Sequence, residues 1–375
     1  MSEIACTRLD SYEEHSVYQA VKHQFELLKI TDELKPGMKV LLKPNLLMKR
    51  KPEEFTTTHP AVIKAVARAV KELGVTDLVV ADSPGGPYTK PLLTSIYHTA
   101  GLNKLSDECG VLLNTETGYR EKKRFENRIC KQFYLINPVL EADYIIDICK
   151  LKTHGMVGLS GAVKNLFGCV PGLMKPELHF RFPEEEKFCE MLVDLCETVH
   201  PNFTIVDAVD AMEGDGPSGG TLRHTGMILA GKNPYDVDLL LCDLIGFDPQ
   251  KIYTVRAALQ RKLSVPSVKE VVILGDQPYR YPDFVKPVSH GVDFSASLPR
   301  WFPKKILNHF SSKPKIIEKG CIGCGKCAES CPAKTIEISG RKAKIHYENC
   351  IRCFCCHEMC PVKTIQIKRS RFYRF

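Results

Sequence analysis

The chain has 375 residues, with 52 Lys or Arg against 44 Asp or Glu, which gives a formal net charge of +8 at pH 7. This length exceeds what one small core needs and predicts two domains. No apolar run approaches the ~20 residues of a transmembrane helix, and the N-terminus has no basic segment followed by an apolar one. We therefore expect a cytoplasmic protein without a transmembrane segment.

Segments up to residue 299 alternate β-branched or leucine-rich runs with helical patterns. A strand is predicted over 38–47, followed by a helix over 59–74 that has Pro60 in its first turn and Gly74 after its last. Further strands are predicted at 77–83, 111–116, 143–154, 203–212, 226–231 and 270–276, and further helices at 92–102, 158–168, 184–200, 234–247 and 253–263. This alternation is typical of an α/β fold with a mainly parallel sheet and helices on both faces.

Polar residues are concentrated where the predicted strands end, which is the edge at which a doubly wound sheet binds its ligands. Lysines, histidines and glycine-rich turns at such an edge suit an anionic small molecule, such as a phosphate, a carboxylate or an enolate-like intermediate. The candidate ligand-binding residues are Lys43, Asn45, His59, Asp82, Lys164, Asn165 and Asp215. The candidate catalytic residues are Lys152, His154 and Glu213, with His154 or Glu213 moving protons.

Several of these residues also have a plain structural interpretation. His59 could only cap a helix, and Asp82 and Asp215 could only close turns. Lys164 could lie on a solvated helix face. Their common position at one edge of one sheet favours a ligand site. Neither a Walker A sequence nor a dinucleotide-binding glycine pattern occurs, so a nucleotide cofactor is not indicated.

Nine of the seventeen cysteines lie in the last 55 residues, and eight of them form one pattern that occurs twice. The pattern reads C-x-x-C-x-x-C-x-x-x-C-P, and its cysteines are Cys321, Cys324, Cys327 and Cys331, then Cys350, Cys353, Cys356 and Cys360. It is typical of bacterial ferredoxins with two [4Fe–4S] clusters, in which the fourth cysteine of each run binds the other cluster. The octapeptides 331–338 and 360–367 are nearly identical, and each ends in a short alternating strand.

The crossover assigns one cluster to Cys321, Cys324, Cys327 and Cys360, and the other to Cys350, Cys353, Cys356 and Cys331. A structural zinc site would not require the three closely spaced cysteines twice. Disulfides are typical of secreted chains. Cys355 falls outside the spacing, and we interpret it as a non-ligand that could replace Cys356 after rearrangement. The sequence thus predicts a small α+β ferredoxin domain.

Charge is distributed unevenly between the two parts of the chain. Residues 300–375 contain 17 Lys or Arg and 5 Asp or Glu, a net charge of +12, whereas residues 1–299 have a net charge of −4. Two clusters with their thiolates would contribute about −4, which leaves the C-terminal part basic. A basic surface favours docking of an acidic redox partner protein, or of residues 1–299. Nucleic-acid binding is disfavoured because no stacking motif or recognition helix accompanies the charge.

The predicted organisation is an α/β domain over 1–276, a basic proline-rich linker over 277–315 and a ferredoxin-like domain over 316–375. Within 36–276 the chain contains V-L-L-K-P-N-L, A-D-S-P, K-L-K-T-H, G-A-V-K-N-L-F-G and H-x-R-F. In these motifs it resembles a prokaryotic family catalogued as domain of unknown function three-six-two. Some members of that family carry a two-cluster ferredoxin domain at the C-terminus. The resemblance implies this architecture and no particular reaction.

These features predict an iron–sulfur oxidoreductase that delivers electrons from two [4Fe–4S] clusters to an anionic small molecule at the α/β domain. Two other hypotheses stay open from the sequence. In one, the protein is a non-catalytic electron carrier or adaptor for a redox partner. In the other, it is an accessory protein for cofactor or metal-site assembly, or an iron–sulfur sensor. A flavin is conceivable, but no residue pattern requires one.

Overall fold

The computed structural model describes residues 1–290 and 312–368. Most of the predicted linker, 291–311, and the last seven residues, 369–375, lie outside the described part. The described start of that linker, 277–290, packs along the α/β domain. Phe284 is buried there against Phe247, and Tyr281 donates a backbone hydrogen bond to the carbonyl oxygen of Leu244 at 2.6 Å.

A nine-stranded sheet forms the centre of the first domain, in the order β11-β1-β10-β9-β7-β2-β3-β4, with β8 paired to β7. Its strands are β1 (Ser2–Arg8), β2 (Lys39–Pro44), β3 (Asp77–Val80), β4 (Leu112–Leu113), β7 (Tyr144–His154), β8 (Gly158–Ser160), β9 (Phe203–Glu213), β10 (Thr221–Gly231) and β11 (Val271–Gly275). Strands β9, β7, β2, β3 and β4 run parallel, and β1 is parallel to β11. Only β10 and β8 are antiparallel to their neighbours among these described strands. The mainly parallel sheet predicted from the sequence is confirmed.

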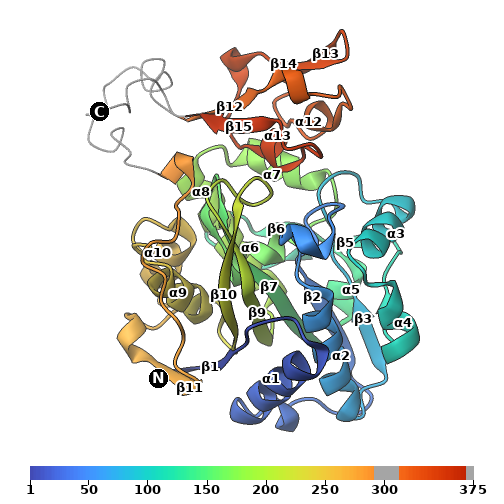
Figure 1. Ribbon diagram of the computed structural model, residues 1–375, viewed down its shortest axis with the longest axis vertical. Coiled ribbons are helices and arrows are strands. Elements are labelled where there is room, and N and C mark those ends of the chain that lie inside the picture. The colour runs from blue at the N-terminus through green and yellow to red at the C-terminus, as the bar shows by residue number, and fades with distance from the viewer. Residues whose placement is uncertain (291–311, 369–375) are drawn as a thin grey trace.

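Helices cover both faces of this sheet, as predicted (Figure 1). One face carries α1 (Glu14–Leu27) and α2 (Pro60–Glu72), and the other carries α8 (Glu185–Val199), α9 (Pro234–Leu244) and α10 (Tyr253–Gln260). The remaining helices of the domain are α3 (Lys90–Thr99), α4 (Asn103–Cys109), α5 (Asn137–Glu141), α6 (Ala162–Asn165) and α7 (Met174–Arg181). A separate hairpin joins β5 (Tyr119–Lys123) to β6 (Gln132–Ile136).

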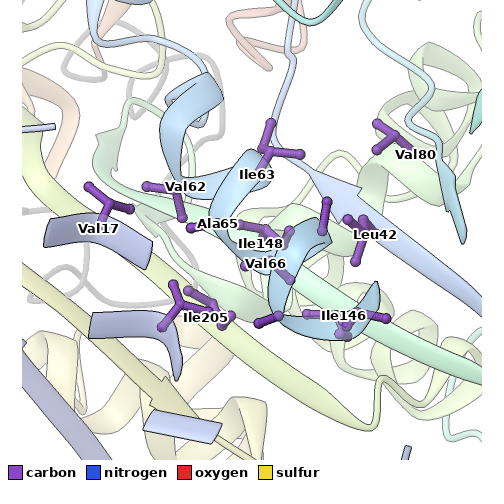
Figure 2. Close-up of a cluster of buried hydrophobic side chains, with 14 of the residues drawn as sticks. Val17, Leu42, Val62, Ile63, Ala65, Val66, Val80, Ile146, Ile148 and Ile205 are labelled. Carbon is purple, nitrogen blue, oxygen red and sulfur yellow. The ribbon is translucent and has the colours of Figure 1, made fainter. Parts of the chain in front are cut away.

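The packing of α2 shows why the pattern of the sequence gives this arrangement. His59 caps the helix by accepting a hydrogen bond on Nδ1 from the N–H of Ala61 at 3.2 Å, and Pro60 occupies the first turn. Val62 and Val66 then face the sheet, where they meet Ile146 of β7 and its neighbours (Figure 2). Successive strand residues point to opposite faces, so Ile145 packs in the core on the far side.

The α/β domain differs from the prediction at several elements. The sequence patterns missed β1, α1, the β5–β6 hairpin and the helices α4, α5 and α7. The predicted helix over 158–168 is wrong at its start, because 158–160 form β8 and the helix α6 begins only at Ala162. The buried carboxylate of Asp238 accepts hydrogen bonds from the N–H groups of Ala162 at 2.7 Å and Val163 at 3.1 Å, which fixes the start of the helix there.

The second domain lies over the carboxyl ends of the parallel strands (Figure 1). Its elements are β12 (Lys313–Ile316), α12 (Lys326–Glu329), β13 (Ile336–Ser339), β14 (Lys342–Ile345), α13 (Cys355–Glu358) and β15 (Ile365–Lys368). Two antiparallel pairs, β12–β15 and β13–β14, flank the two short helices. The repeated octapeptides supply β13 and β15, as the sequence predicts.

The two domains share one buried interface. Phe354, Cys355 and Ile367 of the second domain belong to the same hydrophobic cluster as Leu166 and Phe167 of the first. Glycines allow the close approach. A Cβ atom on Gly155 would lie 2.5 Å from Ile367 Cδ1, and one on Gly219 would lie 2.6 Å from His357 Cε1.

Hydrogen bonds complete the interface. The buried guanidinium of Arg50 donates to the carbonyl oxygens of Cys360 and Pro361, both at 3.1 Å. Ser218 Oγ donates to the carbonyl oxygen of Glu358 at 3.0 Å. A shared core with paired polar groups holds the ferredoxin domain in one position against the sheet.

Truncation of the core should test the packing against α2. We expect Ile146→Ala to lower the free energy of unfolding by about 2–5 kcal/mol, because the methyl groups removed leave a cavity between the sheet and the helix. Leu112→Ala, at an exposed position of β4, should change it by less than about 0.5 kcal/mol. Urea unfolding followed by circular dichroism measures both, and equal losses would contradict the described core.

Candidate functional site

The eight cysteines of the repeated pattern lie around two separate cavities in the second domain. Cys321, Cys324, Cys327 and Cys360 line one of them, and Cys331, Cys350, Cys353 and Cys356 line the other. Each space measures about 320 Å³, including volume that is open to solvent. The chain therefore groups the cysteines in the crossed sets that the sequence predicts, and each set supplies the four thiolates that a [4Fe–4S] cluster requires. The donor sets fit such clusters.

Backbone N–H groups point at several of these sulfurs. The N–H of Thr335 donates to Cys331 Sγ at 3.4 Å, and the N–H of Thr364 donates to Cys360 Sγ at 3.3 Å. The two threonines occupy equivalent positions in the repeated octapeptides. Hydrogen bonds to a thiolate favour its charged form and raise the reduction potential of a cluster that it binds.

A third cavity, of about 710 Å³, lies between the two domains. We call it the interdomain pocket. Six of the predicted site residues line it: Asn45, Asp82, Lys152, His154, Lys164 and Asn165. They follow β2 and β3, end β7 and belong to α6, so the carboxyl edge of the sheet brings them together. The ferredoxin domain contributes Ser330, Cys355, Glu358 and Met359 to the opposite wall.

Lys43 lies beneath the pocket and supports its wall. Its ammonium is fully buried, lies 2.8 Å from Asp82 Oδ1 and donates to the carbonyl oxygen of Pro44 at 2.7 Å. Burial, the largest single effect, opposes the charged form of Lys43, but Asp82, Cys169 and Asp147 together outweigh it and raise the pKa of the lysine. The second carboxylate oxygen of Asp82 accepts the N–H of Leu46 at 3.0 Å. This pair fixes the loops that follow β2 and β3.

A chain of hydrogen bonds orients the amide groups of the pocket. Lys152 Nζ donates to Asn45 Oδ1 at 2.7 Å and to the carbonyl oxygen of Thr56 at 2.7 Å. Asn45 Nδ2 donates to Asn165 Oδ1 at 2.8 Å, and Asn165 Nδ2 donates to Asp147 Oδ1 at 2.7 Å. Burial, with the nearby charge of other lysines, lowers the pKa of Lys152 to about 7. This lysine can therefore gain or lose its charge near neutral pH.

His154 joins the two domains within the pocket. Its Nδ1 accepts the N–H of Met156 at 3.1 Å and that of Val157 at 3.4 Å, which places the proton of the neutral ring on Nε2. Nε2 lies 3.1 Å from Glu358 Oε1 of the ferredoxin domain. Burial lowers the pKa of His154, against the attraction of Glu358. Burial alone would raise the pKa of Glu358, but its contact with His154 and the nearby Lys164 lower it to about 2.

Helix α7 supplies two pocket residues that are absent from the predicted site. Lys175 Nζ donates to the carbonyl oxygen of Ser83 at 2.6 Å and to its hydroxyl at 2.9 Å, and burial lowers the pKa of this lysine to about 7. His179 stacks on Phe188 with ring centroids 4.1 Å apart, and burial lowers its pKa to about 3. The H-x-R-F motif marks His179 in the sequence. No comparable signal marks Lys175, or Glu358 beside the cluster cysteines.

Two polar groups are available to a ligand. His179 Nδ1 is buried, and it has no hydrogen-bond partner among the described residues. Lys164 Nζ lies 4.7 Å from the centroid of the Phe167 ring, and within residues 1–290 and 312–368 no hydrogen bond or ion pair holds it. Both side chains line the interdomain pocket. Their positions favour an anionic ligand held at this wall.

Besides Lys43, three predicted site residues lie outside the pocket lining. The N–H of His59 donates to Asp207 Oδ2 at 2.8 Å, and its ring caps α2. Glu213 Oε2 accepts the N–H of Val285 at 3.0 Å, and Asp215 Oδ1 accepts the N–H of Val288 at 2.8 Å. The two carboxylates hold segment 277–290 against the domain, which is a structural role. A position after the end of a strand does not by itself distinguish this role from ligand binding.

Cys355 separates the pocket from a cysteine cavity. It lines the interdomain pocket, whereas its neighbours Cys353 and Cys356 line the cavity of the second cysteine set. In the sequence, Cys355 stands between two cysteines of the second set. The spare cysteine identified in the sequence faces the ligand side.

Residues 313–361 match a 4Fe-4S dicluster domain, which agrees with the cysteine geometry. The protein is therefore an iron–sulfur electron-transfer protein with a ferredoxin domain. Residues 40–243 match the model of the domain of unknown function DUF362, and the chain belongs to this family.

A thylakoid-associated protein of Synechocystis sp. is 29% identical over 302 residues, which cover 78% of this chain and 91% of that protein. Two solved structures resemble parts of the fold. The lactate racemase apoprotein of Thermoanaerobacterium thermosaccharolyticum is 13% identical, with a TM-score of 0.39 over 66% of this chain and 57% of that one. A protein of Thermotoga maritima is 14% identical, with a TM-score of 0.33 over 55% of this chain and 53% of that one. None of the described helices is both long and apolar enough to cross a membrane.

Cysteine substitutions should separate ligands from the spare cysteine. After anaerobic reconstitution, we expect about eight iron atoms per chain in the unchanged protein and in Cys355→Ser, because four thiolates bind each cluster. Cys356→Ser should lower the iron content, since it removes one thiolate from the second set. Iron and protein assays on the same samples measure this. A loss in Cys355→Ser with none in Cys356→Ser would contradict the assignment.

Proposed function

We propose that the protein is an oxidoreductase that delivers electrons to an anionic small molecule bound in the interdomain pocket. One observation carries the proposal: the pocket has cationic residues of the α/β domain on one wall and residues of the ferredoxin domain on the other. When bound, [4Fe–4S] clusters supply single electrons. We further propose that the eight cysteines of the two cavities hold two such clusters.

Different residues of the pocket have different roles in ligand binding and proton transfer. Lys164 and His179 present polar atoms to the ligand, and Lys152 and Lys175 add charge when they are protonated. The Nε2–H of His154 lies at the wall of the pocket beside Glu358, and Lys152 and Lys175 in their protonated forms can give a proton to a reduced ligand. Apolar side chains such as Leu47 and Phe167 limit access of water.

The short distance between the cluster-binding cysteines and the interdomain pocket favours an enzyme over a protein that only carries electrons. A carrier has no use for a buried polar pocket beside its clusters, with Cys355 in the wall that separates them. Burying Lys152 and Lys175, which have no carboxylate partner among the described residues, costs free energy that a bound anion would offset.

A reducing compartment suits this function, and we propose the cytoplasm. None of the seventeen cysteines, all of which lie within the described residues, forms a disulfide, and eight of them lie in the α/β domain. Free thiols in this number are typical of a reducing environment.

Ligand affinity should depend on pH in a defined direction. An anion raises the pKa of Lys152 and Lys175 above their value of about 7, so binding takes up protons. Affinity should be highest below about pH 7 and should fall above it, by up to about tenfold per pH unit for each lysine. Calorimetric titration with phosphate and a panel of small carboxylates, in buffers of different ionisation enthalpy, measures both affinity and proton uptake. Binding without proton uptake would contradict the role of these lysines.

Electron delivery should require the pocket. We expect an accepted anion to reoxidise the anaerobically reduced protein, which the visible absorbance of the clusters reports. Lys164→Gln should raise the ligand concentration needed by about tenfold or more, because it removes the ammonium that faces the ligand. Lys104→Gln, on the exposed surface of α4, serves as the matched control and should leave it unchanged. The oxidoreductase proposal fails if no anion that binds reoxidises the clusters, or if both variants behave alike.

A further inference from the structure

The two cysteine cavities differ in how they meet solvent. Around the cavity of Cys321, Cys324, Cys327 and Cys360, three aliphatic side chains are exposed: Ile322 by 61%, Val362 by 41% and Ile338 by 37%. Cys324 itself is exposed. The other cavity has no strongly exposed aliphatic side chain in its lining within the described residues, and Cys353 and Cys356 are buried. The first set of cysteines thus lies towards solvent and is called the outward set. The second set is more enclosed and is called the inward set, and Cys355 of the pocket lining stands between two of its members in the sequence.

Basic residues surround the outward set. Lys342 Nζ donates to the carbonyl oxygens of Glu318 at 2.8 Å and Cys321 at 2.7 Å. Arg341 is exposed beside Gly323, because a Cβ on that glycine would lie 2.5 Å from the carbonyl oxygen of Arg341. In the sequence, Lys326 directly precedes Cys327 and Lys319 lies two residues before Cys321.

These residues outnumber the acidic ones near them. The four basic side chains Lys319, Lys326, Arg341 and Lys342 stand against Glu318 and Glu329 in the same loops and helix. An exposed apolar centre with a charged rim is the composition of a transient protein interface. A rim of one sign attracts a partner of the opposite sign and orients it before contact.

We propose that this outer face, formed by Ile322, Ile338 and Val362 with the rim Lys319, Lys326, Arg341 and Lys342, docks an acidic electron-transfer protein. The inference rests on the proposed function and deepens it, since it assigns the outer face as the surface at which electrons enter the protein before they reach the pocket. A second copy of this chain would bring two basic rims together, so the charge disfavours it as the occupant.

The docked partner exchanges one electron in each encounter. The partner is oxidised by one electron and the protein is reduced by one, with no bond formed or broken between them. Two encounters supply the electron pair that a two-electron reduction in the pocket requires. The outward cysteine set receives the electron because the partner covers Cys324, and the inward set lies beside Cys355 at the pocket.

Charge reversal on the outer face tests the inference in the full-length reconstituted protein. The probe is an acidic flavodoxin in its fully reduced form, and stopped-flow absorbance follows reduction of the clusters at several ionic strengths. In the unchanged protein the second-order rate should fall as salt rises. Lys326→Glu with Arg341→Glu should lower the rate at low salt by about tenfold or more and flatten its salt dependence.

A matched double variant, Lys251→Glu with Lys269→Glu, carries the same charge change on exposed positions of the α/β domain. Its rate should stay within about twofold of the unchanged protein. Photochemical reduction without a partner protein should reach the same extent in all three, which shows that the clusters are intact.

Equal slowing in both double variants, or a rate that does not respond to salt, would overturn the outer face as the docking surface. So would a failure of flavodoxin to bind or reduce the protein at low salt when photoreduction succeeds. The readout needs no ligand in the pocket, so failure of the oxidoreductase proposal and failure of this one give different results.

Discussion

The contact between the ferredoxin domain and the carboxyl edge of the sheet is the constraint on which the site depends. Glu358 reaches His154 across this contact, and Arg50 reaches back to the carbonyl oxygen of Cys360. Neither domain encloses the interdomain pocket alone, because its walls come from both. The buried cluster shared by Phe354, Ile367 and the α/β core keeps the two walls at a fixed separation.

Buried charge then gives the pocket its character. Lys43 keeps its proton because Asp82 lies beside it, whereas Lys152 and Lys175 have backbone carbonyls and neutral groups as partners, and burial lowers their pKa values. The same type of side chain therefore has two roles, one structural and one responsive to a ligand. An anion that enters the pocket supplies the missing negative charge and restores the protonated form of the responsive lysines.

Much of this arrangement follows from local sequence patterns. The strands that precede Asn45 and Asp82, and the strand that contains Lys152, were predictable from period and composition, and the parallel topology places their ends together. The crossed cysteine sets were predictable because the spacing of the repeat admits few other geometries. Lys175 and Glu358 were not predictable. Each lies in a short helix whose position depends on packing between distant segments, and that information is absent from local sequence. Glu213 and Asp215 show the converse, since a strand-end carboxylate can equally hold a neighbouring loop.

Electron paramagnetic resonance of the reduced protein, with and without a bound anion, examines the link between pocket and clusters most directly. The inward cysteine set borders the pocket through Cys355, so binding should change the signal of one cluster and leave that of the outward cluster unaltered. The change should saturate at the same anion concentration as binding measured by calorimetry. If calorimetry shows the anion bound and neither cluster signal changes, the pocket is not electronically connected to the clusters, and the protein transfers electrons without using it.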